Sequence, residues 1–156
     1  MSDDKKFLRK AIEIASSGIS SGGGPFGAVI SKEGRLIAGF NNRVVLNSDP
    51  TAHAEILAIR EAARFLRTHD LNGCVLYTSC EPCPMCLGAI YWSGIKRVVY
   101  ASGRHDAAAA GFVDELIYNE ISLDPSKRQI TFLHMEDHEA TEVFRKWEKY
   151  DGKTTY

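Results

Sequence analysis

The sequence predicts an α/β fold, in which helices pack on a central β-sheet. Apolar residues recur at helical spacing in a segment near the N-terminus and again after Pro50. Short apolar runs such as Cys74-Val75-Leu76-Tyr77 have the length and character of buried strands. Helical and strand patterns alternate along the chain, and this alternation is typical of α/β domains.

The N-terminal half begins with an amphipathic helix over residues 4–18, whose repeating apolar positions are Phe7, Leu8, Ala11, Ile12, Ala15 and Ile19. A run of three glycines and Pro25 then interrupts the chain. Two apolar stretches, 28–30 and 36–38, flank Glu33-Gly34 and predict a hairpin. Pro50-Thr51 opens a second helix, which carries apolar residues as far as Leu66.

The C-terminal half continues the alternation and then loosens. Pro82 suits the first position of a helix that reaches about Trp92, because proline lacks the N–H that has no partner there. Val98-Val99-Tyr100 is typical of another strand. Beyond it the pattern predicts a short helix near 115–119, a strand near 130–133 and a last helix with Val143, Phe144 and Trp147.

The composition fits one globular domain that acts on a small molecule. A chain of 156 residues is the size of a single domain. Basic residues number 19 and acidic residues 20, whereas proteins that grip a phosphate backbone usually carry a basic excess. We therefore expect no nucleic-acid partner. No apolar run approaches the ~18 residues of a membrane helix, and the N-terminus does not resemble a signal peptide, so we expect a cytoplasmic location.

The strongest chemical signal is His53-Ala54-Glu55 followed by Pro82-Cys83-Pro84-Met85-Cys86. Cys83 and Cys86 are three residues apart at a predicted helix start, so their side chains lie on one face of the helix. The helix dipole there favours the thiolates that a metal requires. With His53 as a third ligand, the fourth tetrahedral position remains open for water, which is the catalytic arrangement of zinc.

Glu55 is too close to His53 in sequence to be a ligand as well, but it can reach a water molecule on the metal. A carboxylate there can take a proton from that water and return it to the substrate. The pattern H-x-E…P-C-x-x-C is the signature of zinc-dependent nucleobase deaminases. One zinc ion, held by His53, Cys83 and Cys86, is therefore the predicted cofactor, and Glu55 is the predicted catalytic group.

Other interpretations of the cysteines compete with this one. Cys80 could complete a closed, structural zinc site, or it could be a small core residue, which we favour. An iron–sulfur run would need a further cysteine where Ile90 stands, and a redox Cys-x-x-Cys pair is a third option. Cys74 is expected in the core. The remaining histidines are expected at the surface: His69, His105, His134 and His138.

The residues around these motifs resemble the cytidine-deaminase superfamily. The segments that carry the resemblance are Thr51-Ala-His-Ala-Glu55 and Cys80-Glu-Pro-Cys-Pro-Met-Cys-Leu-Gly-Ala-Ile90. Asp106-Ala-Ala-Ala-Ala-Gly-Phe-Val-Asp114 and the tail, Phe144-x-x-Trp147 ending in Tyr156, are similar to bacterial guanine deaminases. One departure is Val113, where that branch often has an acidic residue.

This resemblance implies a three-layer α/β/α sandwich with a mixed sheet of about five strands and a single deaminase domain over residues 1–156. It implies that Asn42 and the backbone N–H of Ala54 bind substrate, and that Phe26 and Trp92 form walls of a base pocket. Ordinary core packing is the alternative for Phe26 and Trp92, and a turn position is the alternative for Asn42. The implied reaction is hydrolysis of guanine to xanthine and ammonia.

Asp114 also has a chemical case of its own. The Watson–Crick edge of guanine presents N1–H and N2–H donors, and a carboxylate accepts two parallel hydrogen bonds. Adenine presents an acceptor at N1, so a carboxylate there would be poorly paired. We therefore expect Asp114 to bind guanine and to relay protons, with a surface acid near a helix start as the alternative.

The resemblance further implies a homodimer in which the segment from about residue 138 crosses to the partner, so that Tyr156 helps to close the partner's site. A frayed terminus is the alternative for Tyr156. Guanosine, cytosine and adenosine in tRNA remain alternative substrates for the same chemistry. A non-catalytic zinc module remains the alternative from a different class of protein.

Overall fold

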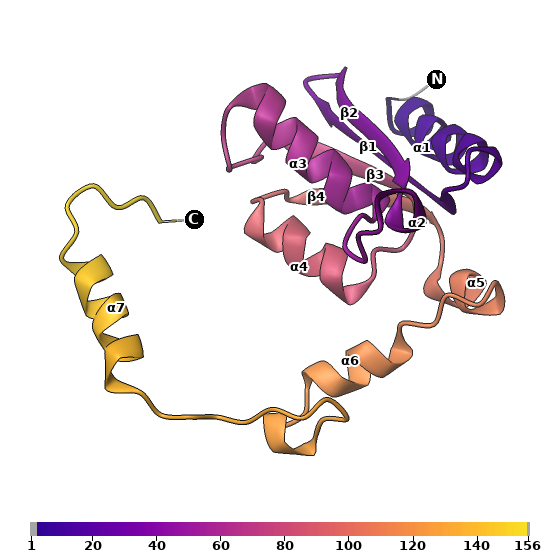
Figure 1. The fold of residues 1–156 in the computed structure, drawn as a ribbon. Helices are drawn as coiled ribbons and strands as arrows, with labels where there is room; N and C mark the ends of the chain where they lie inside the picture. The colour runs from indigo at the N-terminus through magenta and orange to yellow at the C-terminus, as the bar shows by residue number, and fades with distance from the viewer. Residues whose placement is uncertain (1–2, 156) are drawn as a thin grey trace. The chain divides into compact units, whose positions relative to one another are not determined.

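The computed structural model describes residues 3–155 and divides into two units (Figure 1). The first unit is Met1–Asp114 and contains a β-sheet with its covering helices. The second unit is Glu115–Tyr156 and contains helices and irregular chain. All the candidate metal ligands lie in the first unit, so its architecture is the one that positions the site.

The sheet of the first unit has four strands in the order β2-β1-β3-β4. The strands are β1 (Gly24–Lys32), β2 (Arg35–Asn42), β3 (Cys74–Cys80) and β4 (Arg97–Ser102). The first three pair antiparallel, and β4 lies parallel to β3, so the sheet is mixed as predicted. The hairpin turn is at Glu33-Gly34, where both residues have positive φ angles of 50° and 73°.

One face of the sheet is covered by α1 (Asp3–Ser20). Phe7 and Ala11 of this helix are buried against Val29 of β1 and Tyr77 of β3. The rings of Phe7 and Tyr77 lie 5.3 Å apart, at a distance where aromatic pairs attract. The amphipathic pattern therefore predicted the correct helix. Phe7, Ala11 and Ala15 are buried, whereas Ile12 and Ile19, counted in the same pattern, are 43% and 57% exposed.

The opposite face is covered by α3 (Ala54–Leu66) and α4 (Pro84–Trp92). Successive strand residues point to opposite faces, so Ala28, Ile30 and Leu76 join the core under α3 while Val29 and Tyr77 face α1. Figure 1 shows the sheet between α1 on one side and α3 with α4 on the other. The predicted three-layer α/β/α arrangement is confirmed.

Both site-bearing helices begin later than the sequence predicted. Asp49 accepts hydrogen bonds from the backbone N–H and the hydroxyl of Thr51, at 2.8 and 2.7 Å, so the chain turns there and α3 starts at Ala54. Helix α4 starts at Pro84 rather than Pro82. The residue before a proline is pushed out of the helical region, and Cys83 is accordingly extended at φ −67° and ψ 169°.

Two short helices of the first unit were not predicted, α2 (Val44–Asn47) and α5 (Arg104–Ala109). The second unit holds α6 (Glu115–Ile121), a 3₁₀ turn at Pro125–Lys127 and α7 (His138–Glu148). The short helix near 115–119 and the last helix with Val143, Phe144 and Trp147 are therefore confirmed.

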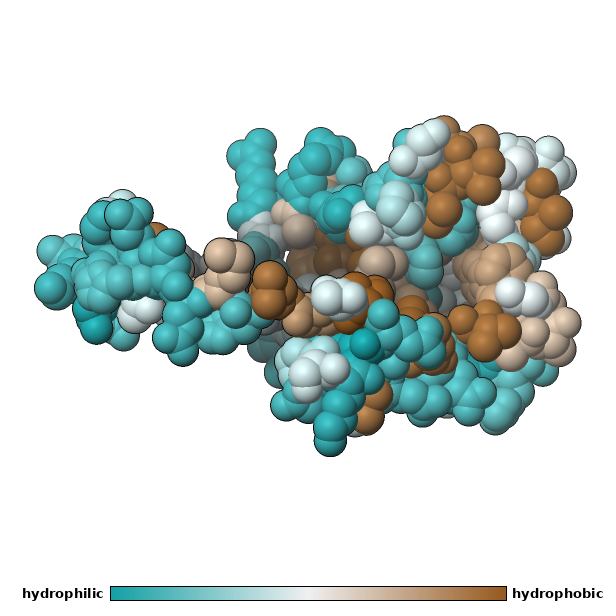
Figure 2. All heavy atoms as spheres, turned by 60° about the horizontal axis from the view of Figure 1, so that its bottom comes forward, coloured by the Kyte–Doolittle hydropathy of each residue, from teal (hydrophilic) through white to brown (hydrophobic). Residues whose placement is uncertain are grey.

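The strand predicted near 130–133 is absent from the part of the chain that the structure describes, which gives four strands instead of about five. Residues 131–137 belong to no element, and Ile130, Phe132 and Leu133 are exposed. A strand requires a neighbour for its backbone hydrogen bonds, and this segment has none within its own unit. Figure 2 shows apolar atoms at the surface among hydrophilic ones.

Within residues 3–155, no helix combines the length and the apolar character that crossing a membrane requires.

Gly27 tests the fit between α1 and the sheet. A Cβ at this buried position would collide with the carbonyl oxygen of Ala11 and would lie 2.6 Å from the backbone nitrogen of Ala15. We expect Gly27→Ala to lower the free energy of unfolding by about 2–3 kcal/mol, because helix backbone cannot yield as a side chain can. Chemical denaturation measures this change. The control is Gly88→Ala, whose Cβ meets open space within α4 and should stabilise by roughly 0.5–1 kcal/mol.

Candidate metal centre and active site

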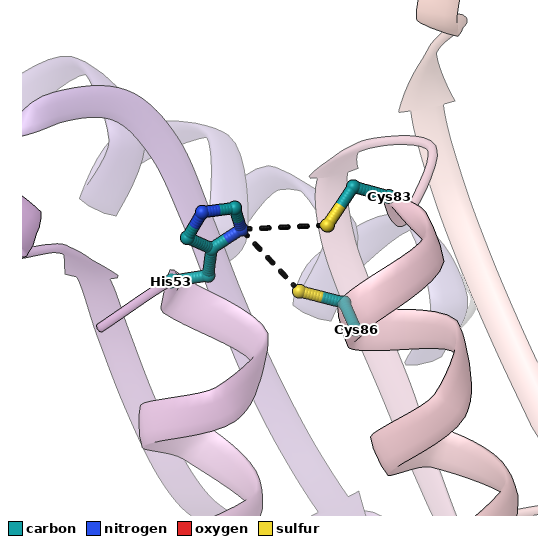
Figure 3. A group of neighbouring side chains, drawn as sticks. All are labelled: His53, Cys83 and Cys86. Atoms are coloured by element: carbon teal, nitrogen blue, oxygen red, sulfur yellow. Dashed lines mark hydrogen bonds between the residues drawn. The ribbon is translucent and has the colours of Figure 1, made fainter. Parts of the chain in front are cut away.

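Three side chains meet between the starts of α3 and α4 (Figure 3). His53 Nδ1 lies 3.5 Å from Cys83 Sγ and 3.5 Å from Cys86 Sγ, and all three ligand atoms lie within 4.8 Å of one another. Tetrahedral zinc with ordinary bond lengths would place a nitrogen and a sulfur ligand about 3.6 Å apart. The cluster therefore has the dimensions and the donor types of a zinc site.

The backbone explains why these side chains are free to meet. His53 is the N-cap residue of α3, and Cys83 is the N-cap residue of α4. N-cap side chains often accept hydrogen bonds from their own helix, but the imidazole of His53 does not. The sulfur of Cys83 accepts from the backbone N–H of Cys86 in the first turn of α4. Cys86 lies in the first turn of α4 and is fully buried. The N-termini of α3 and α4 thus bring their metal-ligand atoms to one point, and the positive ends of both helix dipoles lie there as well.

The electrostatics of the cluster favour a thiolate at Cys83. The hydrogen bond from Cys86, together with that from His53, lowers the pKa of Cys83 to about 4 despite its partial burial. The hydrogen bond to Cys83 raises the pKa of His53. The same partnership with Cys83, followed by burial, raises the pKa of Cys86. A divalent cation would hold both sulfurs as thiolates, because a coordinating thiol loses its proton.

The carboxylate of Glu55 lies beside the cluster and is only 5% exposed. Its Oε1 accepts a hydrogen bond from Thr78 Oγ1 at 3.0 Å, and its Oε2 lies 3.5 Å from Cys86 Sγ. Burial raises the pKa of Glu55, because the charged form is poorly solvated there. A carboxyl group next to a metal site, with a raised pKa, has the properties of a proton-transfer group.

Two of the predicted substrate-binding residues, Ala54 and Asn42, are buried, one at the start of α3 and the other at the end of β2. Ala54 is fully buried as the first residue of α3, where its N–H has no acceptor within the helix. Asn42 is buried at the end of β2, and its Oδ1 accepts a hydrogen bond from the Val44 N–H at 3.2 Å. This bond fits the turn interpretation of Asn42, and a role in substrate binding stays a prediction for both residues.

Phe26 is half-buried, and its ring meets Phe112 edge to face at 4.8 Å. It also lines a cavity of about 360 Å³ with residues of α1 and α5, and none of the metal-cluster residues lines that cavity. Trp92 is 70% exposed at the end of α4, so the core-packing alternative does not describe it. Asp114 is half-buried just before α6, and Tyr156 lies outside the described residues.

The remaining cysteines and histidines lie where the sequence indicated. Cys80 is 6% exposed, and its Sγ is 3.6 Å from the carbonyl oxygen of Gly103, so it does not complete the cluster. Cys74 is buried in the core. Among the described residues, His53, Cys83 and Cys86 form the single cluster with metal-ligand geometry. The other four histidines are exposed: His69, His105, His134 and His138.

Thr78 is the residue at the site that the sequence did not indicate. It is completely buried, and its partner Glu55 is 23 positions away in the chain. A threonine in an apolar strand is common, and its spacing carries no motif. The pairing becomes visible once α3 is packed on the sheet.

Comparison with known families agrees with this geometry. Residues 1–102 match the family model of the cytidine and deoxycytidylate deaminase zinc-binding region. The chain belongs to this family. The match contains the whole metal cluster and Glu55, and it ends at the last residue of β4.

Individual relatives extend the likeness beyond the family's zinc-binding region. A guanine deaminase of Bacillus subtilis (strain 168) is 49% identical over 151 residues, which are 96% of this chain and 97% of that protein. The X-ray structure of guanine deaminase from Bacillus subtilis superposes with a TM-score of 0.95 at 48% identity, covering 97% of this deaminase and 98% of that chain.

Other members of the family are similar over a shorter part. A solved structure with bound 2,6-diaminopurine has a TM-score of 0.69 at 41% identity and covers 71% of this chain and 62% of that one. A tRNA-specific adenosine deaminase of Aquifex aeolicus (strain VF5) is 46% identical over 62% of this chain and 64% of its own length. These relatives therefore differ from the present chain more in the C-terminal part than around the metal cluster.

The cluster predicts opposite outcomes for two neighbouring cysteines. Cys83→Ala should lose bound zinc, because two ligands hold the ion far more weakly than three. Cys80→Ala should keep one zinc per chain, because its sulfur points to Gly103. Metal content after dialysis, measured by atomic emission, checks both variants. Zinc loss in Cys80→Ala would instead support a closed site with four protein ligands.

Proposed function

We propose that this deaminase hydrolyses guanine to xanthine and ammonia with one zinc ion per chain. The observation that carries the proposal is the 49% identity to a guanine deaminase over 96% of the chain. That similarity includes the segment after β4, where the tRNA-specific relative no longer aligns over a comparable length. The donor set of the cluster and the adjacent buried carboxylate supply the chemistry that such a reaction needs.

His53, Cys83 and Cys86 are proposed to hold the zinc ion. A zinc ion held there would act as a Lewis acid and bring the pKa of a bound water molecule close to 7. Glu55 takes the proton of the attacking water through Oε2, the oxygen on the cluster side. Oxygen then bonds to C2 of guanine, and Glu55 passes the first proton to ring N3. The proton of the new C2–OH group moves to the amine with the help of Glu55, the C2–N bond breaks as C2=O forms, and ammonia leaves. The atoms of one water molecule thereby enter xanthine and ammonia.

Asp114 is proposed to accept hydrogen bonds from N1–H and N2–H of guanine and to assist the departure of the amine. Asn42 and the backbone N–H of Ala54 are proposed as further hydrogen-bonding groups. Phe26 and Trp92 are proposed as the apolar walls of the base pocket. Such a polar pattern would discriminate against adenine strongly, because a carboxylate opposite the adenine N1 lacks a donor.

We also propose a dimer in which the C-terminal segment, from about residue 138, crosses to the partner. Strand β4 is at the edge of the sheet, and its outer backbone groups are available for another strand. Just before the proposed crossing segment, the apolar side chains of Leu133 and Met135 are 81% and 77% exposed. An edge strand and exposed apolar side chains of this kind are features that a second copy of the chain would cover.

We further propose that the protein is cytoplasmic. Its proposed partners are a small purine base and a second copy of the chain. The four cysteines are unpaired, which fits a reducing compartment.

The substrate is tested by measuring ammonia release from guanine and guanosine side by side. We expect the zinc-loaded protein to release ammonia from guanine and not from guanosine. Glu55→Gln is the matched blank, since it should keep zinc and lose nearly all turnover with its proton acceptor removed. Release of ammonia from guanosine alone would indicate a nucleoside deaminase. If neither compound releases ammonia, cytosine and tRNA are the next substrates to test.

The exchange of C-terminal segments is tested by complementation. A chain lacking residues 154–156 should keep zinc but lose activity, because the partner's site stays open. Co-expression of this chain with full-length Glu55→Gln should restore activity, since the intact tail of the second chain completes the intact site of the first. The control pairs the shortened chain with a shortened Glu55→Gln chain. Full activity of the shortened chain alone would refute a role for Tyr156.

A further inference from the structure

The side chain of Thr78 is enclosed by the central part of the fold. It is 0% exposed, and its strand β3 has a hydrogen-bonded neighbour on each side. Thr78 pairs with Ala28 of β1 and with Tyr100 of β4. A β-branched side chain in a strand has few rotamers, so its hydroxyl is held in one place before any substrate arrives.

This hydroxyl donates to Oε1 of Glu55 at 3.0 Å. A glutamate side chain has three rotatable bonds, and a hydrogen bond to one oxygen restricts the direction of the other. The other oxygen, Oε2, lies on the side of the metal cluster, 3.5 Å from Cys86 Sγ. Thr78 therefore holds one carboxylate oxygen from the side of the sheet, while the second oxygen faces the metal cluster.

The second contact of the carboxylate does not survive metal binding. Cys86 donates to Oε2 through its thiol proton, and a sulfur that coordinates zinc has no proton to donate. The hydroxyl of Thr78 remains as the side-chain donor to Glu55 in the loaded enzyme, beside the backbone N–H of Glu55 itself. Most buried hydroxyls have a hydrogen-bond acceptor, and here the acceptor is the carboxylate proposed to move the protons.

We propose that Thr78 is a positioning residue for Glu55, which keeps the free carboxylate oxygen within reach of both the attacking water and the substrate. The proposal rests on the proposed function, since it assigns Thr78 to the same proton transfer. Misplacement of a reacting group by about 1 Å can cost roughly 100-fold in rate. The loss should fall on kcat, because Thr78 does not touch the substrate.

The test compares Thr78→Val, which removes the hydroxyl at similar size, with Thr78→Ser, which keeps it. The control Tyr77→Phe removes a hydroxyl from the preceding residue of the same strand, which bonds to Asp4 on the opposite face. We expect kcat for guanine to fall by roughly 10- to 100-fold in Thr78→Val with KM and zinc content unchanged. Thr78→Ser and Tyr77→Phe should keep kcat near that of the unmodified chain.

A crystal structure of Thr78→Val should show Oε2 of Glu55 displaced from the cluster, a measurement that does not depend on the substrate. Unchanged kcat, or an equal loss in Thr78→Ser, would overturn the positioning role. If Thr78→Val does not fold, Thr78→Ala removes the same hydroxyl without adding a methyl group in its place. Failure of the unmodified chain to release ammonia from guanine would count against the proposed function alone, since the position of Glu55 still tests Thr78.

Discussion

The convergence of two helix starts is the constraint on which the site depends. Helix α4 follows β3 and leads to the parallel strand β4, so its N-terminus must lie beyond the carboxyl end of β3. Helix α3 packs on the same face of the sheet and starts beside it. Their N-cap residues, His53 and Cys83, therefore face each other across 3.5 Å although 30 positions separate them. The two positive dipole ends make this point favourable for thiolates.

The local sequence maintains this convergence through backbone chemistry. Pro84 forces Cys83 out of helical geometry, so its sulfur projects from the helix end instead of lying along the helix surface. The turn closed by Asp49 and Thr51 delays the start of α3 until after His53, which gives that imidazole the corresponding position. The ligands are thus positioned by local turns of the backbone on either side of the cluster.

The sequence predicted the layers and the cluster because those features have local signatures. Apolar periodicity located α1, and the paired motifs located His53, Cys83 and Cys86. The starts of α3 and α4 were predicted too early. Pro50 and Pro82 both suit the first turn of a helix, and only the turns that follow them show that the helices begin later. The prediction of a strand near 130–133 was wrong. An apolar run shows that side chains could be buried, but it does not show whether a neighbouring strand exists to pair with. Thr78 went unnoticed because its role depends on a contact across 23 positions.

The two faces of the sheet pack against their helices in different ways. The face toward α1 is packed with large rings, Phe7 and Tyr77. The face toward α3 meets a stripe of fully buried alanines, Ala54, Ala58 and Ala62, which occupy little space between helix and sheet. A carboxylate on α3 can therefore reach a hydroxyl on β3 within 3.0 Å. Burying a carboxyl group costs free energy, and the hydrogen bond that Thr78 donates to Glu55 offsets part of that cost.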